Sequence, residues 1–191
     1  EEDGEIQSML QLNPYQLQVA EHPFLCRYII AVATRAQYRS RGYMSSLLRK
    51  AMQEMYGKKE PFTFLMPAAE AIYTPYDFRF VYSQRQAVFE KKAETELIEE
   101  EDATMFQAEE LAAFAKERLF GTARVYAVRD AHYYQTRVLE QQSENGGIRM
   151  LKKDGKLVGI YCYAKEETCE VLEPLILPGY ETVFWDSISG L

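Results

Sequence analysis

The chain has 191 residues, of which 47% are hydrophobic and 13% aromatic, and its formal net charge is −7. This length accommodates one large domain or two small ones, each with a well-filled core. Because phosphate binding depends on clustered lysine and arginine, the acidic balance argues against a nucleic-acid partner. No run approaches about eighteen consecutive apolar residues, and the acidic start is unlike a signal peptide, so we expect a cytoplasmic protein with no membrane partner.

The cysteines and histidines form no recognisable metal-ligand pattern. Cys26, Cys162 and Cys169 lack a Cys-x-x-Cys pair or a nearby histidine pair, and His22 and His132 are isolated in the sequence. Zinc sites bring such ligands together at short, characteristic spacings. We therefore expect three reduced thiols, packed or solvated histidines, and no metal.

The first predicted elements are two strands, residues 6–12 and 15–20, which turn about Asn13 and Pro14. Proline cannot donate to a strand ladder, so Pro14 is expected in the turn rather than inside a strand. The next strand is the apolar run at residues 28–33, Tyr-Ile-Ile-Ala-Val-Ala. An unbroken run of this kind is typical of a central strand covered on both faces.

A helix is predicted to begin near Gly42, because apolar residues recur at helical spacing from there on. These positions are Met44, Leu47, Leu48, Met52 and Met55. The first N–H groups of a helix have no intrahelical partner and carry about half a positive charge, so they attract anions. Gly42 leaves room for an anion to approach, and Arg39 and Arg41 add positive charge. The segment is either a pyrophosphate site or an ordinary loop with two solvated arginines.

The segment after this helix places a tyrosine near the same sheet edge. Residues 62–66 form a short apolar strand, expected to lie parallel to the preceding one across a right-handed crossover. Pro67 opens a short helix over residues 68–73, and Pro75 ends it. Tyr73 then lies at the carboxyl edge of neighbouring parallel strands, where open sheets bind ligands. It is either a proton donor or a packed tyrosine with a satisfied hydroxyl, and Tyr76 is its nearest rival as the acid.

These residues resemble the motifs of the GNAT acyl-CoA N-acetyltransferases. The pyrophosphate loop of that superfamily, Arg/Gln-x-x-Gly-x-Gly/Ala, corresponds to residues 39–44, Arg-Ser-Arg-Gly-Tyr-Met, where Met44 replaces the final small residue. The later motif, aromatic-Tyr-x-x-x-Gly-Phe, corresponds to residues 72–78, where Asp77 replaces glycine. Aspartate tolerates the left-handed conformation that glycine adopts there. Within the superfamily the chain looks most like the Eis group (enhanced intracellular survival proteins).

The resemblance implies a transfer of the acetyl group from acetyl-CoA to a primary amine by direct attack. The acceptor would be a small molecule of the aminoglycoside, polyamine or lysine-like kind, and Tyr73 would protonate the departing thiolate. The implied cofactor-binding residues are Val32, Ala33, Thr34, Arg39, Ser40, Arg41, Gly42, Tyr43 and Met44. Eis-like proteins take their general base from a terminal carboxylate in a further domain, so no base is assigned, and they often assemble as hexamers, so a homo-oligomer is expected.

The expected fold class is α/β (α+β), a GNAT-like mixed twisted sheet with flanking helices followed by a second, degenerate GNAT-like domain. We place the first domain at residues 1–100, without its first helices, and the second at residues 101–191, so the chain looks truncated at both ends. Residues 87–90 and 95–99 are expected as the last strands of the first domain. The acidic run at residues 99–102 is expected to be a solvated connector rather than an attractor of cationic acceptors.

The second half reads as two helices followed by an antiparallel meander. The helices are predicted at residues 105–120, capped by Thr104, and at residues 129–142, where Tyr133, Tyr134 and Val138 form a packing face. Strands are predicted at residues 147–152, 156–165 and 168–176, with a hairpin turn at Asp154 and Gly155. No Arg-x-x-Gly loop follows, which favours a structural role over a second catalytic site. A non-catalytic acyl-CoA-binding protein and a structural piece of a larger assembly remain the alternatives to an enzyme.

Overall fold

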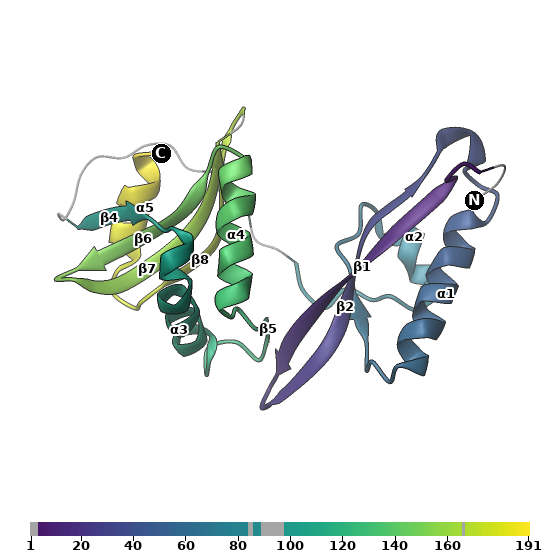
Figure 1. The fold of residues 1–191 in the computed structure, drawn as a ribbon, viewed down its shortest axis with the longest axis horizontal. Coiled ribbons are helices and arrows are strands. Elements are labelled where there is room, and N and C mark those ends of the chain that lie inside the picture. The colour runs from purple at the N-terminus through teal and green to yellow at the C-terminus, as the bar shows by residue number, and fades with distance from the viewer. Residues whose placement is uncertain (1–3, 84–85, 89–97, 166) are drawn as a thin grey trace. The chain divides into compact units, whose positions relative to one another are not determined.

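The computed structural model describes residues 4–83, 86–88, 98–165 and 167–191 (Figure 1). The chain forms two compact units, one of residues 1–85 with 124–128 and the other of residues 86–123 with 129–191. Each unit contains a four-stranded sheet. The division into domains at residue 100 and the degenerate character of the second domain stay predictions.

The first unit is built on a long hairpin of β1 (Ser8–Val19) and β2 (His22–Thr34). Its sheet has the order β3-β2-β1-β5, where β3 is Thr63–Phe64 and β5 is Val125–Ala127. Helix α1 (Tyr43–Gly57) connects β2 to the parallel β3, as predicted. A 3₁₀ turn, η1 (Ala36–Tyr38), lies between β2 and α1. After β3 come the short helix α2 (Glu70–Tyr73) and a second 3₁₀ turn, η2 (Thr74–Tyr76).

The predicted hairpin about Asn13 and Pro14 is wrong. β1 runs through both residues, and the hairpin turn lies at residues 20–21, where Val19 pairs with His22. Pro14 pairs with Arg27 on β2. On its other side, β1 pairs with β5 at residues 17–19 alone, as far as the chain is described, so β5 does not extend to Pro14. Pro14 therefore lies on a locally open edge, where a missing N–H leaves no ladder bond unmade.

One face of the first sheet packs under α1. The buried residues of this core are Ile29, Leu48, Ala51, Met55 and Tyr73. The prediction that the 28–33 run is central is confirmed, since β2 lies between β1 and β3. The prediction that it is covered on both faces is wrong within this structure, because Ile30 is 37% exposed. Alternating side chains place Ile30 on the opposite face from Ile29, away from α1.

The second unit is an antiparallel sheet with helices on both faces. Its strands are β4 (Glu99–Asp102), β6 (Gly147–Lys153), β7 (Lys156–Lys165) and β8 (Cys169–Ile176), in that order across the sheet. Helices α3 (Ala108–Leu119) and α4 (Ala131–Ser143) pack on one face through residues such as Leu111 and Val138. Helix α5 (Glu181–Ser189) packs on the other through Val183, Phe184 and Ile188.

The two predicted helices and the meander of the second half are confirmed. The 3₁₀ turn η3 (Met105–Gln107) precedes α3, and Thr104 caps it by accepting from the Phe106 N–H at 3.3 Å. Tyr134 and Val138 are buried as predicted, and Tyr133 is partly buried against the same core. The Tyr133 hydroxyl donates to Glu173 at 2.7 Å. All three cysteines are free thiols, as expected.

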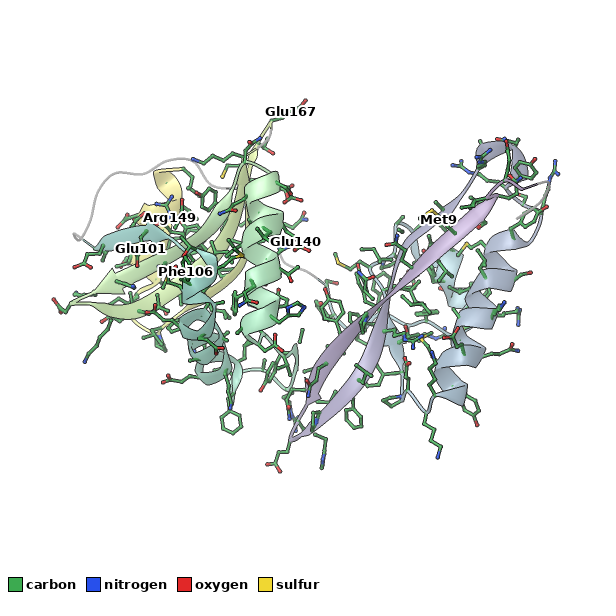
Figure 2. All side chains as sticks on the ribbon, viewed as in Figure 1. Met9, Glu101, Phe106, Glu140, Arg149 and Glu167 are labelled. Carbon is green, nitrogen blue, oxygen red and sulfur yellow. The ribbon has the colours of Figure 1, made fainter. Side chains whose placement is uncertain are left out.

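The prediction of a solvated acidic connector is wrong, because residues 99–102 form β4 and pair with β6. Arg149 on β6 lies 2.9 Å from Glu100 and 3.0 Å from Asp102, and Lys152 lies 2.6 Å from Glu101. Arg149 and Glu101 are labelled in Figure 2. Opposite charges on adjacent strands stabilise the pairing, and charged side chains protect a sheet edge from other strands. Of the strands expected before this run, residues 89–97 lie outside the described part of the chain.

No helix in the described ranges is long and apolar enough to cross a membrane. Among the same residues, no group of three or more histidine, cysteine and acidic side chains could hold a metal ion.

Candidate active site

The candidate site begins where β2 and β3 separate. These parallel strands pair only at Arg27 with Thr63 and at Tyr28 with Phe64. β2 continues to Thr34, while the chain after Phe64 leaves the ladder toward α2. From Ile29 onward, the β3-facing edge of β2 has no strand partner within the described residues. This open edge includes the predicted positions Val32, Ala33 and Thr34.

The backbone of β2 is irregular within this open stretch. Met9 on β1 pairs with Ala33 and Gln11 pairs with Ile30, so β2 carries one extra residue here. Ala31 takes the left-handed conformation, with φ of 54°. A β-bulge of this kind redirects the backbone groups next to it, and bulges often occur beside active sites. The two residues of β2 in the bulge are Ala31 and Val32, which lie opposite the single residue Leu10 of β1.

The loop after β2 leads into α1. Ser40 and Gly42 both have positive φ, 59° and 84°. The helical ladder begins with the Ser46 N–H, which donates to the Gly42 carbonyl at 2.9 Å, so the preceding N–H groups have no acceptor within the helix. Left-handed residues next to a helix start gather N–H groups around an anion site. A Cβ added to Gly42 would meet nothing within 4 Å, so the space in front of this helix start is open.

The arginines of this loop are exposed, and each makes one local contact. Arg39 Nε donates to the Thr34 carbonyl at 3.3 Å, and the Arg41 guanidinium lies 5.1 Å from the centre of the Tyr38 ring. Neither arginine is in an ion pair found among the described residues. In contrast, the neighbouring Arg35 pairs with Glu5 at 2.6 Å. Within the described ranges, Arg39 and Arg41 thus place positive charge near the start of α1 with no acidic side chain in ion-pair distance.

Tyr73 packs into the α1 core at the end of α2 and is 8% exposed. Val32 and Met44 lie partly buried in the same cluster, which joins the open strand, the helix start and the tyrosine. The Tyr73 ring meets Phe78 edge to face, with centroids 5.9 Å apart. Tyr73 is therefore packed, and no hydrogen bond of its hydroxyl is found among the described residues.

Burial raises the pKa of the Tyr73 hydroxyl, and the neighbouring Tyr28 phenol adds to the rise. A raised pKa keeps the phenol protonated across the physiological pH range. The rival Tyr76 lies in η2 under the guanidinium of Arg49, 5.7 Å from its ring centre. Asp77 adopts the left-handed conformation with φ of 65°, which is the conformation that aspartate was expected to tolerate there.

Sequence reasoning missed two contributors to this region. Tyr28 was assigned only to a strand, although it lies at the point where β2 and β3 part. Ser8 on β1 donates to the Ala33 carbonyl at 3.0 Å and lies 2.9 Å from the Thr34 hydroxyl, which fixes the end of β2. The aromatic character that Tyr28 shares with Phe64 could have indicated the role of Tyr28. No sequence signal pointed to Ser8.

Residues 1–81 match the family model described as an acetyltransferase (GNAT) domain. The match covers less than half of the chain, and the likeness of this first part is to a GNAT-type acyltransferase domain. Among curated protein sequences, no match to the chain was found. The GNAT assignment therefore comes from the family model over this first part, and it names no acceptor.

Solved structures share the fold of the chain at low sequence identity. A probable N-acyltransferase from Enterococcus faecalis V583 has a TM-score of 0.73 at 17% identity, covering 98% of this chain and 50% of its own. A GCN5-related N-acetyltransferase from Kribbella flavida has a TM-score of 0.70 at 14% identity, covering 98% and 48%. Eis1 from Mycobacterium abscessus has a TM-score of 0.61 at 15% identity, covering 98% and 51%.

The chain thus spans about half the length of these proteins, and its fold is α+β and GNAT-like. Eis1 is one of several distant structural neighbours, so the closer likeness to the Eis group stays a prediction.

Proposed function

We propose that the GNAT domain is an acetyl-CoA-dependent N-acetyltransferase that acts on a primary amine, with Tyr73 as the general acid. The observation that carries the proposal is the open helix start at Gly42. Met44 of this helix shares one packed cluster with Val32 of β2 and with Tyr73. An anion-binding helix start beside an unpaired strand edge suits a ligand with phosphates at one end and amides further along.

Different residues of the site would bind different parts of acetyl-CoA. The amides at the start of α1, with Arg39 and Arg41, would hold the pyrophosphate through charge-assisted hydrogen bonds. Backbone groups of Val32 and Thr34 would pair with the amides of the pantetheine arm, as an added strand would. The Thr34 carbonyl now accepts from Arg39 Nε, so this arginine would release it when the phosphates bind.

The reaction forms a bond from the amine nitrogen to the acetyl carbon and breaks the bond from that carbon to sulfur. The oxyanion would be held by a backbone N–H near Val32, at the bulge, and the departing thiolate would take the hydroxyl proton of Tyr73. The amine nitrogen would lose its proton to solvent, and solvent would return a proton to the Tyr73 phenolate. A phenol pKa of about 10 against a thiol pKa of about 8.5 makes this transfer uphill by about 2 kcal/mol, and burial of Tyr73 adds to that. Barrier reductions of about 8 kcal/mol or more are usual in enzymes, so the cost is acceptable.

The decisive experiment is thiol release from acetyl-CoA with a panel of aminoglycosides, polyamines and lysine peptides, using the whole chain. Tyr73→Phe should lower the turnover rate about a hundredfold or more, which is usual for a lost general acid, and should leave acetyl-CoA affinity within about twofold. Tyr76→Phe is the matched control and should keep the wild-type rate. An unchanged rate in Tyr73→Phe would rule out this tyrosine as the acid.

The low exposure of Tyr73 supports one second candidate, a non-catalytic acyl-CoA-binding domain. Such a protein would show an acetyl-CoA-dependent rise in melting temperature and would release no thiol with any amine. Its acetyl-CoA affinity would be the same in Tyr73→Phe. If acetyl-CoA does not change the melting temperature, the chain would instead be a structural piece of a larger assembly. We further propose that the second unit is a degenerate GNAT-like domain, as in Eis-type proteins, and that the chain forms homo-oligomers.

A further inference from the structure

Three aromatic rings gather at the point where β2 and β3 part. Tyr28 and Phe64 form the last pair of the parallel ladder, and their rings stack with centroids 5.1 Å apart and planes at 22°. Tyr15 on β1 meets both rings edge to face, at 6.0 Å from Tyr28 and 5.8 Å from Phe64. We call these three residues the aromatic wall. All three are partly buried.

The aromatic wall lies on the sheet face that is turned away from α1. Leu12 and Ile29 pair with one another and belong to the core under α1. Side chains alternate along a strand, so Tyr28 points to the other face, as does its ladder partner Phe64. Ile30, two residues after Tyr28 on the same face and closer to the bulge, is 37% exposed. The open face beside the gap between the strands is thus bounded by the aromatic wall at its closed end.

The proposed binding mode directs an acyl group toward this closed end. With phosphates at Gly42 and amides paired at Thr34 and Val32, the pantetheine arm would run along β2 in the direction of Tyr28. A short ethylene link separates its last amide from sulfur, so the thioester would lie beside Ile29 or Ile30. Any carbons beyond the carbonyl would continue into the aromatic wall. They could not pass between β2 and β3 there, because the strands are paired at Tyr28 and Phe64.

We infer that the stacked rings of Tyr28 and Phe64, braced by Tyr15, form the end of the acyl site and restrict the donor to short acyl thioesters such as acetyl-CoA. This inference rests on the proposed function and adds a residue-level basis for acyl-chain selection. Packed aromatic rings do not move easily to admit a longer acyl chain, because extra carbons pressed against them would force side chains out of their rotamers and shift the backbone. The wall acts by exclusion and takes no part in the chemistry.

The test is isothermal calorimetry of CoA, acetyl-CoA, butyryl-CoA and hexanoyl-CoA with the whole chain. In the wild type, hexanoyl-CoA should bind at least about tenfold more weakly than acetyl-CoA, in line with the effect of extra carbons in a closed pocket. Phe64→Ala and Tyr28→Ala should bring the two affinities within about twofold by opening the end of the site. Tyr28→Phe keeps the ring and should keep the wild-type ratio.

Phe62→Ala is the matched control. Phe62 precedes Phe64 by two residues, so alternation puts it on the same face, and it contacts Phe24 with centroids 6.3 Å apart. It lies on the far side of the ladder from the gap, about 7 Å from Phe64 along the strand. Its removal should leave the ratio of acetyl-CoA to hexanoyl-CoA affinity unchanged.

Two kinds of failure are distinguishable. If CoA itself does not bind, the proposed function falls, and the acyl-site inference falls with it. If CoA binds but the wild type accepts hexanoyl-CoA as well as acetyl-CoA, or Phe64→Ala keeps the wild-type ratio, only the inference is overturned. Should an alanine variant not fold, Phe64→Leu and Tyr28→Leu remove the stacked ring while keeping an apolar side chain, and they carry the same expectation.

Discussion

Each of the two units contains a bulged strand that is followed by a glycine with positive φ and then by a helix. In the first unit, β2 has a bulge with Ala31 at φ of 54°, and Gly42, with φ of 84°, precedes α1. In the second unit, β8 has an extra residue opposite β7, Glu173 has φ of 55°, and Gly179, with φ of 89°, precedes α5. A bulged strand followed by a glycine-led helix therefore occurs twice in this chain.

The side chains at the two helix starts differ. At α1, the loop carries the exposed Arg39 and Arg41. At α5, the loop residues Leu177 and Pro178 carry no charge, and the Gly179 N–H donates to the Glu181 carboxylate at 2.9 Å. At α5 an acidic side chain thus accepts from a backbone N–H just before the helix, and no such side-chain acceptor is found before α1 among the described residues. Backbone conformation alone thus does not make an anion site, because the neighbouring side chains decide whether the amides are available.

The largest effect should come from placing a bulky side chain at one helix start and then at the other. Gly42→Trp should weaken acetyl-CoA binding by about a thousandfold or more, since each of several charge-assisted hydrogen bonds contributes about 1.5–3 kcal/mol. Gly179→Trp is the matched control. Both glycines have positive φ and open space at the Cβ position, so both substitutions cost about 1–2 kcal/mol of backbone strain. Calorimetry showing wild-type affinity in Gly42→Trp, or lost affinity in Gly179→Trp, would contradict the comparison.

Alkaline pH should destabilise the second unit through its buried thiol. Burial, followed by the charge of Glu173, raises the pKa of Cys162 to about 11. The folded state then holds a proton that the unfolded thiol loses near pH 8.5, so the associated stability is present below about pH 8.5 and lost as the pH rises toward 11. A shift of about two units corresponds to about 3 kcal/mol. Burial also raises the pKa of Tyr134 and of Tyr161 to about 12, which extends the same trend.

Trp185 on α5 is the single tryptophan and reports on unfolding of this unit. Its fluorescence in urea should show a lower unfolding midpoint at pH 10 than at pH 8. Cys162→Ala should reduce the difference between the two midpoints, whereas Cys169→Ala, which removes an exposed thiol, should leave the difference as it is. Equal midpoints at the two pH values in the wild type would show that the buried thiol does not govern alkaline stability.

The arginines at α1 should have a smaller effect than the glycine. Arg39→Ala and Arg41→Ala should each weaken acetyl-CoA binding about tenfold or somewhat more, the usual loss for one charge-assisted hydrogen bond. The loss should shrink at high salt, because these side chains are exposed and therefore screened. Arg35→Ala is the control from the same loop, since its charge is already paired with Glu5. Equal losses at all three positions would indicate a general effect of charge and not a specific phosphate site.

The sequence was sufficient for the elements around the candidate site. Apolar spacing from Met44 to Met55 predicted α1, and the short run around Phe64 predicted a parallel strand. The Arg-rich turn was predicted from local chemistry and from the resemblance to the GNAT motifs, and Asp77 was identified from that resemblance. Local patterns could not show that β2 and β3 part after Tyr28, since the separation is set by where the chain goes after Phe64.

The errors share a physical cause, which is long-range pairing. Pro14 reads as a turn residue until β1 is seen to have an open edge at that point. β5 has only the residues Val125–Ala127, too few for a period-two pattern, and its partner β1 lies more than a hundred residues earlier. The acidic β4 is a strand because Arg149 and Lys152 lie opposite it, and no local propensity favours strand formation by four consecutive acidic residues.

The smallest effect should come from opening the second helix start. Glu181→Ala removes the carboxylate that accepts from Gly179 and that faces the positive end of α5, so the second unit should lose about 0.5–1 kcal/mol. Urea unfolding followed by Trp185 fluorescence measures this loss, and Glu170→Ala, an exposed acidic residue on β8, serves as the control. Exposing these amides should not create a second acetyl-CoA site, because the loop residues Leu177 and Pro178 carry no arginine. Calorimetry on the Gly42→Trp, Glu181→Ala double variant should therefore show no binding, and recovered binding would mean that a glycine-led helix start binds acetyl-CoA without arginines in its own loop.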